Sequence, residues 1–480
     1  MEGIEPDRLA AALVVLAEVE ELPHDHPDAV AVRRAVGGLF KTVKLTRRAE
    51  RQARERAHDD AVTAATATGA PGRIDDETAG AFALTTETTT DLAGILTRPR
   101  GCYICKVRYV EVDAFYHQLC PSCAAFNRAR REARTDLTGR RALLTGGRAK
   151  IGMYIALRLL RDGAHTTITT RFPSDAVRRF SAMEDSADWL HRLRIVGIDL
   201  RDPAQVIALA DSVAAAGPLD ILINNAAQTV RRSPGSYSHL VAAESAPLPD
   251  GPLPDVLSLS GAVREHSKEL TNLAEHPLAA TELTANSLTA LSLTAGSSSL
   301  DRVSAGTAID AGGLVPDLAA VNSWTQLVDE VDPLELLEVQ LCNSTAPFLL
   351  VSRLRASLAA SSARRKYVVN VSAMEGVFAR GNKGPGHPHT NMAKAALNML
   401  TRTSAQEMLD RDRILMTAVD TGWITDERPH PTKARLHEEG FHAPLDLVDG
   451  AARVYDPIVR GEDGEDLFGV FLKDYKPAQW

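Results

Sequence analysis

The stretch LLTGGRAKIG, residues 143–152, decides the fold that this sequence predicts. It leaves a short apolar strand, turns through glycines and enters a helix. Glycines permit positive φ angles in such a turn and let the backbone come close to a pyrophosphate. The helix N-terminus then offers N–H groups and a partial positive charge to the phosphates. We therefore expect a strand–turn–helix unit that binds the phosphates of a dinucleotide.

Strands alternate with helices on both sides of this stretch. The expected strands are the apolar, β-rich segments at residues 141–144, 166–170, 194–200, 221–224, 366–372, 414–419 and 468–472. Such strands, separated by helices, are typical of a doubly wound parallel sheet. The predicted fold class is therefore α/β, with a Rossmann domain over residues 136–480.

Residues 1–98 read as a helical N-terminal region. Apolar residues recur at helical spacing with charges on the other face, at Val32, Val36, Leu39, Phe40 and Val43. Gly and Pro near residues 64–73 predict the end of a helix and a linker, and the Thr-rich residues 85–90 predict a loop. No residue pattern here indicates chemistry, so we expect a helical hairpin used for packing or for binding a partner.

Two C-x-x-C pairs follow, Cys102 with Cys105 and Cys120 with Cys123. In a reducing compartment this arrangement favours metal binding over disulfides. Four thiolates provide the closed tetrahedral shell that structural Zn(II) prefers. We expect a small zinc-binding module over residues 99–135, and a redox-active dithiol is the alternative. Such a module either clamps the N-terminal helices onto the Rossmann domain or docks a partner protein.

Residues 230–332 interrupt the alternation of strands and helices. The segment is rich in Ser, Thr, Leu, Ala and Pro, and TELTANSLTALSLTAG at 281–296 is almost of low complexity. We expect an insertion that is partly disordered or loosely helical. It follows the fourth strand, at the carboxyl edge where ligands bind in such sheets. A lid over the substrate site and a dispensable insertion are both open interpretations.

Motifs along the Rossmann region resemble those of the short-chain dehydrogenase/reductase family, of which this chain is a divergent member. TGGRAKIG at 145–152 resembles the family's TGxxxGxG turn, and NNAAQ at 224–228 resembles its NNAG segment. GIDLRD at 197–202 is similar to the segment whose Asp, here Asp199, commonly meets the adenine. The resemblance runs from about residue 137 to the C-terminus, without the insertion.

The second half of the region carries the catalytic motifs in the family's order. NSTAPFLL at 343–350 resembles the helix with the catalytic Asn, and VVNVSAMEG at 368–376 resembles the strand that leads to the catalytic Ser. HTNMAKAALNML at 389–400 resembles the Tyr-x-x-x-Lys helix. VDTGWIT at 419–425 is similar to the segment beside the nicotinamide.

The resemblance implies a bound dinucleotide. An acid at the end of the second strand suits the ribose 2′-hydroxyl of NAD, whereas an Arg suits a 2′-phosphate. Here Arg171 ends that strand and Arg148 lies in the turn. We therefore expect NADP(H) rather than NAD(H). The predicted cofactor-binding residues are Thr145, Gly146, Gly147, Arg148, Lys150, Ile151, Gly152, Arg171, Asp199, Leu200, Asn225, Ala226, Ala227 and Lys394.

Three positions depart from the family pattern. Lys150 replaces the middle glycine of the turn, where its side chain either crowds the dinucleotide or sits on a phosphate. Ala373 stands where the catalytic Ser belongs, which leaves only Ser372 beside it. Thr390 stands in place of the catalytic Tyr, while Asn343 and Lys394 match.

A Thr hydroxyl is a far weaker acid than a phenol, and loss of a general acid costs about two to four orders of magnitude in rate. His387, His389 and Lys394 are available as replacements, since histidine titrates near neutrality. Reduction of an activated C=C bond also needs less help from a proton donor. The predicted catalytic residues are Asn343, Ser372, His389, Thr390 and Lys394.

Composition narrows the class of partner. The 480 residues carry a formal charge of −8, which argues against nucleic acid, and we expect the basic run RARREAR at 128–134 to be a solvated helix face. The apolar run at 9–17 is too short to span a membrane, and the acidic start lacks the pattern of a secretory signal. We expect a cytoplasmic protein with a small-molecule substrate. The cationic rim at Arg380 and Lys383 suits an anionic one.

Two functions from different classes fit these patterns. The first, which we favour, is an NADP(H)-dependent oxidoreductase with altered acid–base residues. The second is a catalytically inactive sensor or scaffold that binds a dinucleotide. The resemblance also implies a homo-oligomer.

Overall fold

The computed structural model describes residues 3–71, 73, 91–259, 300–381, 383–425 and 427–480, with isolated residues at 284, 285, 289, 292 and 298. The predicted loop at 85–90 and most of the low-complexity stretch at 281–296 lie outside the described residues.

The central sheet has nine strands in the order β11-β10-β9-β8-β6-β3-β4-β5-β7. All neighbouring pairs are parallel except β10 and β11. The seven predicted strands are confirmed, with small shifts at their ends. The strands are β3 (Arg141–Leu144), β4 (His165–Thr170), β5 (Leu193–Gly197), β6 (Ile221–Asn224), β7 (Asp255–Ser258), β8 (Lys366–Ser372), β9 (Ile414–Asp420), β10 (Phe471–Lys473) and β11 (Lys476–Ala478).

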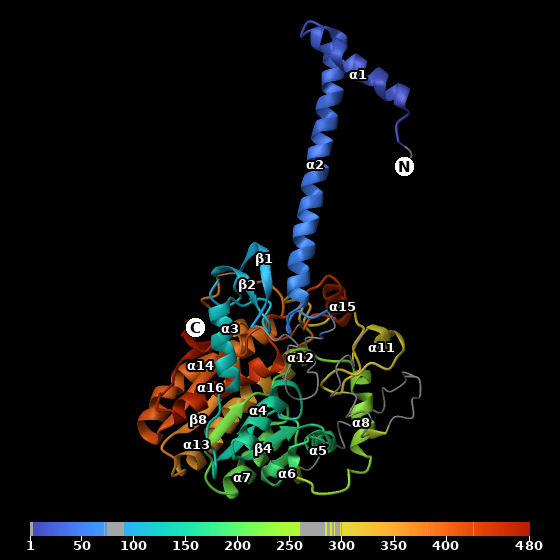
Figure 1. The fold of residues 1–480 in the computed structure, drawn as a ribbon. Helices are drawn as coiled ribbons and strands as arrows, with labels where there is room; N and C mark the ends of the chain where they lie inside the picture. The colour runs from blue at the N-terminus through green and yellow to red at the C-terminus, as the bar shows by residue number, and fades with distance from the viewer. Residues whose placement is uncertain are drawn as a thin grey trace.

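Helices cover both faces of the sheet, as the doubly wound fold predicts (Figure 1). One core packs side chains of α4 (Lys150–Arg161) and α16 (Leu447–Glu462) against residues such as Leu144 and Ile168. The other core packs α7 (Pro203–Ala215), α13 (Ala346–Ala359) and α14 (Pro388–Asp412) against Leu143 and Leu222. Because β3 lies between β4 and β6, the chain reverses direction across the sheet beside β3, and ligands bind at such a switch point.

Shorter helices complete the Rossmann domain. These are α5 (Pro173–Ser181), α6 (Ser186–Trp189), α12 (Pro333–Gln340) and α15 (His430–Glu438). A π-helical turn at Leu341–Thr345 joins α12 to α13.

The described part of the insertion is more ordered than predicted. It contains a 3₁₀ turn at Pro234–Tyr237, α8 (Ser238–Glu244), β7 and α11 (Leu300–Ser304). Strand β7 adds to the edge of the sheet, parallel to β5. The sequence did not reveal β7, because its segment DVLS is only four residues long and follows two prolines.

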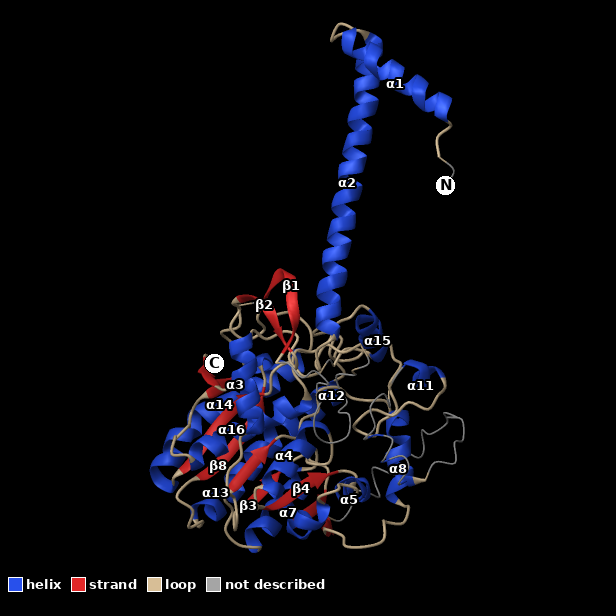
Figure 2. Ribbon diagram, viewed as in Figure 1, coloured by secondary structure: helices blue, strands red, loops and turns tan. Residues whose placement is uncertain are grey.

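The N-terminal helices are confirmed as α1 (Pro6–Glu21) and α2 (Pro27–Ala64), and α2 projects from the body as a long stalk (Figure 1). The predicted boundary at residues 98 and 99 is wrong, because it falls inside β1 (Leu92–Gly101). This strand pairs antiparallel with β2 (Arg108–Asp113), and α3 (Pro121–Glu132) follows. Figure 2 shows this two-stranded ribbon at the base of the stalk, apart from the main sheet.

The basic run at 128–134 is not a solvated face, contrary to the prediction. Arg131 pairs with Asp446 and Asp449, at 2.6 and 3.0 Å, and Arg130 pairs with Asp456 at 3.1 Å. Arg131 is nearly buried. Burial alone would raise the pKa of Asp446, but the Arg131 guanidinium outweighs this effect and lowers that pKa to about 2. The acidic partners lie more than 300 residues away along the chain, so the local sequence did not reveal them.

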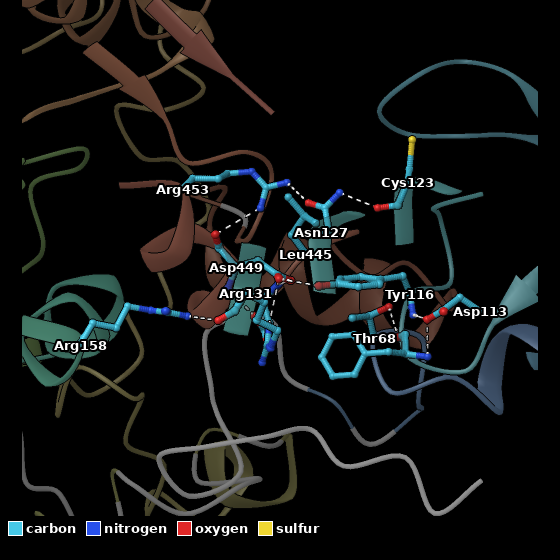
Figure 3. A network of polar contacts seen from close by, with 12 residues as sticks. Thr68, Asp113, Tyr116, Cys123, Asn127, Arg131, Arg158, Leu445, Asp449 and Arg453 are labelled. Carbon is cyan, nitrogen blue, oxygen red and sulfur yellow. Dashed lines mark hydrogen bonds and ion pairs between the residues drawn. The ribbon is translucent and has the colours of Figure 1, made fainter. Parts of the chain in front are cut away.

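The same network continues on both sides of Arg131 (Figure 3). The Tyr116 hydroxyl donates to Asp449 at 2.7 Å, and Arg453 donates to the side-chain oxygen of Asn127 at 2.7 Å. The four-cysteine module is thereby fixed on α16 by a network of buried ion pairs and hydrogen bonds.

Candidate functional site

The glycine-rich turn after β3 requires its glycines. A Cβ on Gly152 would lie 1.9 Å from the carbonyl oxygen of Gly146. A Cβ on Gly147 would lie 2.5 Å from Cγ2 of Ile168, and Gly146 itself has a φ of +71°. The backbone of the turn is therefore packed too closely for larger residues at these three positions.

A second loop holds the turn in place. The hydroxyl of Thr145 accepts from the backbone N–H groups of Asn225 and Ala226, both at 3.0 Å. The amide of Asn225 donates back to the carbonyls of Thr145 and Gly146, at 3.0 and 3.2 Å. Two of the predicted cofactor motifs thus form one hydrogen-bonded unit.

Lys150 keeps the backbone shape of the glycine that it replaces, with a φ of +52°. This left-handed conformation costs an L-residue roughly 1–2 kcal/mol. Its ammonium lies 3.6 Å from a carboxylate oxygen of Asp310, a residue of the insertion. The side chain therefore lies beside an acid of the insertion.

A cavity of about 410 Å³ opens beside the turn, at the carboxyl ends of the strands. Its volume lies within the range of about 300–1,000 Å³ that is usual for ligand pockets. Its lining includes most of the predicted cofactor residues: Gly146, Arg148, Lys150, Ile151, Gly152, Arg171, Asp199, Leu200, Asn225, Ala226 and Ala227. Thr145 and Gly147 are buried behind the wall and support it.

Arg171 lines this cavity beside a stacked pair of aromatic rings. Its guanidinium carbon lies 4.9 Å from the ring centre of Tyr237 and 5.7 Å from that of Phe172. The side chain also donates to the Tyr237 hydroxyl at 3.3 Å. Tyr237 belongs to the insertion, so sequence reasoning did not include it.

Asp199 is held by a cation that sequence reasoning missed. Arg201 donates to its carboxylate at 2.6 Å and to Glu338 at 2.7 Å. Burial raises the pKa of Asp199, but hydrogen bonds and charge from Arg201 outweigh this and lower it. The spacing of two residues between Asp199 and Arg201 was the signal available in the sequence.

Arg148 is engaged by the protein itself. It pairs with Asp175 of α5 and donates to the carbonyl of Gly312 in the insertion at 2.7 Å. Arg179 donates to the same Asp175 at 2.7 Å and to the carbonyl of Ala311 at 2.9 Å. The insertion therefore covers the outer side of the turn, and Gly312 and Leu314 line the cavity.

Asn343 is buried in the π-helical turn before α13. Its side chain makes two bonds with the backbone of Gln228: it accepts from the N–H at 2.7 Å and donates to the carbonyl at 2.9 Å. The neighbouring Cys342 lines the cavity, and burial raises the pKa of its thiol to about 11. The catalytic Asn motif and the cavity are therefore adjacent.

Lys394 is buried on α14, and its ammonium donates to the carbonyl of Val371 at 2.9 Å. Burial lowers the pKa of this lysine to about 8. Cys342, Glu375 and Asp420 are near enough to favour the charged form, but burial dominates.

His389 and Thr390 are buried at the start of α14, with the Thr390 hydroxyl 3.5 Å from Nε2 of His389. Burial lowers the pKa of His389, and its Nδ1 makes no hydrogen bond among the described residues. The histidine is therefore held in its neutral form near pH 7.

Ser372 is directed into the protein rather than toward the cavity. Its hydroxyl donates to the side-chain oxygen of Asn398 at 2.6 Å, and both side chains are buried. Ala373 at the adjacent position has no hydroxyl. Asn343 and Lys394 do not line the cavity themselves, but each neighbours a residue that does: Asn343 bonds to Gln228, and Lys394 lies near Cys342. Ser372 instead makes its bond within the fold.

The predicted cationic rim is partly occupied by its own loop. Lys383 donates to the carbonyls of Glu375 and Val377, and Arg380 lies 3.5 Å from the Glu375 carboxylate. His387 stacks on Trp324 of the insertion, with ring centres 3.9 Å apart. The insertion thus reaches the substrate side of the site as well as the glycine-rich turn.

The four predicted metal ligands are brought together. The Sγ atoms of Cys102, Cys105, Cys120 and Cys123 all lie within 4.8 Å of one another, and none forms a disulfide. Cys105 and Cys120 are 3.6 Å apart, close to the sulfur–sulfur distance of about 3.8 Å that a tetrahedron with 2.3 Å zinc–sulfur bonds requires. The chain reverses at Lys106, whose φ is +64°.

This cysteine cluster also contacts the loop after β9. The Trp423 backbone N–H donates to the Tyr103 hydroxyl at 3.0 Å. Arg73, from the segment that joins α2 to the module, donates to the carbonyls of Ala443 and Leu445 at 2.8 and 2.6 Å. Tyr103 of the module therefore contacts the segment at 419–425 that resembles the nicotinamide-contacting loop, whereas Arg73 binds the chain just before α16.

Comparison with known proteins agrees with this architecture. Residues 140–242 match the sequence model of the family described as short chain dehydrogenase. An uncharacterized protein of Acanthamoeba polyphaga mimivirus is 30% identical over 373 residues, which cover 75% of this chain and 72% of the relative. A "Probable oxidoreductase" of Streptomyces lividans is 43% identical over 93 residues, covering 19% of this chain and 29% of that protein.

The similarity of this chain to one solved structure is low. The short chain dehydrogenase from Burkholderia cenocepacia in complex with NADP has a TM-score of 0.43 and 19% identity, and the alignment covers 70% of this chain and 97% of that one. Across the part of the chain that the structure describes, no helix combines the length and apolar character needed to cross a membrane.

Proposed function

The chain belongs to the short-chain dehydrogenase/reductase family, and from this premise we propose that it is an NADP(H)-dependent oxidoreductase with altered acid–base residues. The observation that carries the proposal is the cavity beside the glycine-rich turn, whose walls come from the family's nucleotide-binding segments. The turn that borders this cavity has glycine at Gly146, Gly147 and Gly152, where a Cβ would clash with the protein itself.

The choice of NADP(H) rests on the cations of this cavity. Arg171, at the end of β4, lines it together with Arg201 and Arg232. A guanidinium binds a phosphate through two parallel hydrogen bonds, and no acid stands at the end of β4 to bind a ribose hydroxyl. We assign the 2′-phosphate to Arg171 rather than Arg148, because Arg148 already pairs with Asp175.

Bound NADPH would supply a hydride, and residues of the chain have to supply the proton. We assign this proton to Lys394, because it lies near Cys342 of the cavity wall and burial brings its pKa to about 8, where an ammonium can give up its proton near neutral pH. The Thr390 hydroxyl, one helical turn earlier, relays it without ionising. A substrate with an activated C=C bond or a quinone suits this weaker proton supply better than a simple ketone. The cationic loop at Arg380 favours an anionic substrate.

Fluorescence titration with NADPH and with NADH tests the cofactor. We expect micromolar binding of NADPH, and Arg171→Ala should weaken it roughly tenfold while changing NADH binding little. The exposed Arg364→Ala is the matched control. If neither nucleotide binds, the oxidoreductase proposal fails.

The second candidate is an inactive sensor or scaffold that binds the nucleotide. Two features favour it: Ala373 leaves the family's Ser position without a hydroxyl, and the neighbouring Ser372 donates its hydroxyl to Asn398. Turnover separates the two candidates: NADPH that binds but is not oxidised by any activated enone or quinone supports the sensor.

We also propose structural zinc at the four cysteines. Four thiols provide all the ligands that a tetrahedral zinc ion needs. The network around Arg131 fixes the module on the Rossmann domain, which supports a role in holding the N-terminal helices on that domain rather than in binding another protein. Metal analysis should give one zinc per chain. Cys120→Ala should lose zinc and unfold at lower temperature, whereas Cys342→Ala should keep it. A metal-free chain with unchanged thermal stability would contradict the proposal.

A further inference from the structure

The helical hairpin of α1 and α2 forms the far end of the stalk (Figure 1). It leaves large apolar side chains exposed. On α1, Leu13 and Val14 are 58% and 56% exposed, and on α2, Leu39 and Phe40 are 66% and 69% exposed. Contiguous apolar patches of this kind mark interaction surfaces. We therefore expect another molecule to bind the hairpin.

The two helices do not cover each other. Near the turn that joins them only Val19 of α1 and Ala29 of α2 are buried. Helix α1 then diverges from α2, as Figure 1 shows. Residues 9–17 of α1 are all apolar, so this helix is apolar around its whole circumference, which is typical of a helix with neighbours on several sides.

Helix α2 offers a matching stripe at the same height. Val32, Val36, Leu39 and Val43 recur at spacings of four, three and four residues, which is the pattern of a helix seam. At a rise of 1.5 Å per residue, this stripe and the apolar part of α1 both lie within roughly 25 Å of the shared turn. Two hairpins side by side would therefore bring apolar segments level with each other.

The charges favour one way of pairing two hairpins. Helix α1 ends with the acids Glu18, Glu20 and Glu21, whereas the charged residues of α2 between 33 and 48 are all basic. Contact between two copies of α2 would bring like charges together. Contact between α1 of one copy and α2 of the other would bring opposite charges together.

We propose that the hairpin is a dimerisation surface for a second copy of this chain, in which α1 of each copy packs on α2 of the other. The two copies form a four-helix bundle around a twofold axis along the stalk, so each contact occurs twice. An anionic membrane fits less well, because the acidic end of α1 would be repelled. A nucleic acid would bind the basic face and leave the apolar stripe uncovered.

Sedimentation velocity of the full chain at about 10 µM tests the proposal. We expect the paired change Leu39→Glu and Phe40→Glu to halve the mass of the wild-type assembly. The matched control, Ala49→Glu with Ala53→Glu, adds the same charge to α2 outside the stripe and should keep the mass. A wild-type monomer, or an assembly that the Leu39 and Phe40 change leaves intact, overturns the proposal.

A mixing experiment tests which helices meet. One variant carries Glu18→Lys, Glu20→Lys and Glu21→Lys, and a second carries Arg33→Glu and Arg34→Glu. Each alone should dissociate, because the charges at 18–21 of α1 and at 33–34 of α2, the segments nearest the turn, then have the same sign. Their mixture should regain the dimer mass, since each α1 then meets an oppositely charged α2 of the other chain. If the mixture does not regain the dimer mass, this pairing of α1 with α2 is overturned. Binding of a monomeric wild-type chain to vesicles of phosphatidylcholine and phosphatidylglycerol would also overturn it.

Discussion

The glycine-rich turn and helix α14, which we propose to be the catalytic helix, each differ from the family pattern at one residue, and the two differences are not of the same kind. At the turn, Lys150 keeps the positive φ that the replaced glycine would adopt without strain. On α14, Thr390 occupies an ordinary helical position that makes no special demand on the backbone. The first substitution costs conformational energy and adds a charge, whereas the second changes only the available chemistry.

This difference separates the backbone geometry of the site from its side-chain chemistry. Backbone geometry is kept in both regions: the turn still packs too tightly for a Cβ on Gly152, and the π-helical turn still buries Asn343. Side-chain chemistry is kept only in part, since Lys394 remains and the tyrosine does not. Cofactor geometry and catalytic chemistry can therefore be tested separately.

The largest expected effect is on chemistry. Lys394→Met should lower the rate of NADPH oxidation with an enone or quinone by about two to four orders of magnitude, because it removes the general acid. In the wild type the lysine is protonated below its pKa of about 8, so the rate of reduction should fall as pH rises through that value.

The pH profile distinguishes this role from a merely structural one. A Lys394→Met variant that stays folded and retains the fall in rate near pH 8 would exclude this lysine as the proton source.

Gly152→Ala should have the next largest effect, on geometry. The added Cβ would meet the Gly146 carbonyl at 1.9 Å, so the turn has to shift. We expect NADPH affinity to fall at least tenfold, and overpacking to lower stability by about 1–3 kcal/mol. Gly37→Ala is the control, because a Cβ there meets no atom within 4 Å. Unchanged binding by Gly152→Ala would show that the cofactor does not depend on this turn.

Restoring the family residues sharpens the comparison. If Thr390 in place of the family's Tyr affects only the proton supply and not the backbone, restoring the phenol should speed the reaction. The paired change Thr390→Tyr and Ala373→Ser should then raise the rate of NADPH oxidation roughly tenfold or more. Thr390→Phe with Ala373→Ser fills the same space without the hydroxyl and should bring no gain. Equal rates for the Tyr and Phe variants would contradict the assignment.

The smallest expected effect is at Lys150. Asp310→Asn removes the acid 3.6 Å from its ammonium but keeps the side-chain oxygen that accepts from Gly312 and Leu314. NADPH affinity should rise about two- to fivefold at low ionic strength, and the gain should shrink as salt is added. Asp317→Asn, elsewhere in the insertion, should leave affinity unchanged. A loss of affinity in Asp310→Asn would mean that the acid supports the site.

The fold could be predicted from the sequence because each of its motifs lies within a short stretch of chain. The turn at 143–152, the strands and the pairs of cysteines are each contained within a few residues, and the structure has them where they were predicted. The site was only partly predictable, since long-range partners decide the state of its side chains. Arg148 is engaged by Asp175 and Gly312, and Arg131 by Asp446 and Asp449, which no local pattern indicates.

The hydroxyl of Ser372 illustrates the same limit. Its position in the motif made it a catalytic candidate, but the motif does not specify the direction of the side chain. That direction is set by Asn398, one residue of a helix that packs on the strand. The strand β7 was missed for a related reason, because pairing with β5 rather than its own four residues makes it a strand.

Strand β7 has a consequence for solubility. Without it, β5 would be the outermost strand of the sheet, and its unpaired backbone groups would be a template for strands of other molecules. Instead the sheet ends in a four-residue strand directly after Pro252 and Pro254, and its other edge ends in β11, which contains Pro477. Proline has no N–H to donate, so both margins resist extension. The insertion thereby protects the protein against edge-to-edge aggregation, whatever it contributes to the cavity.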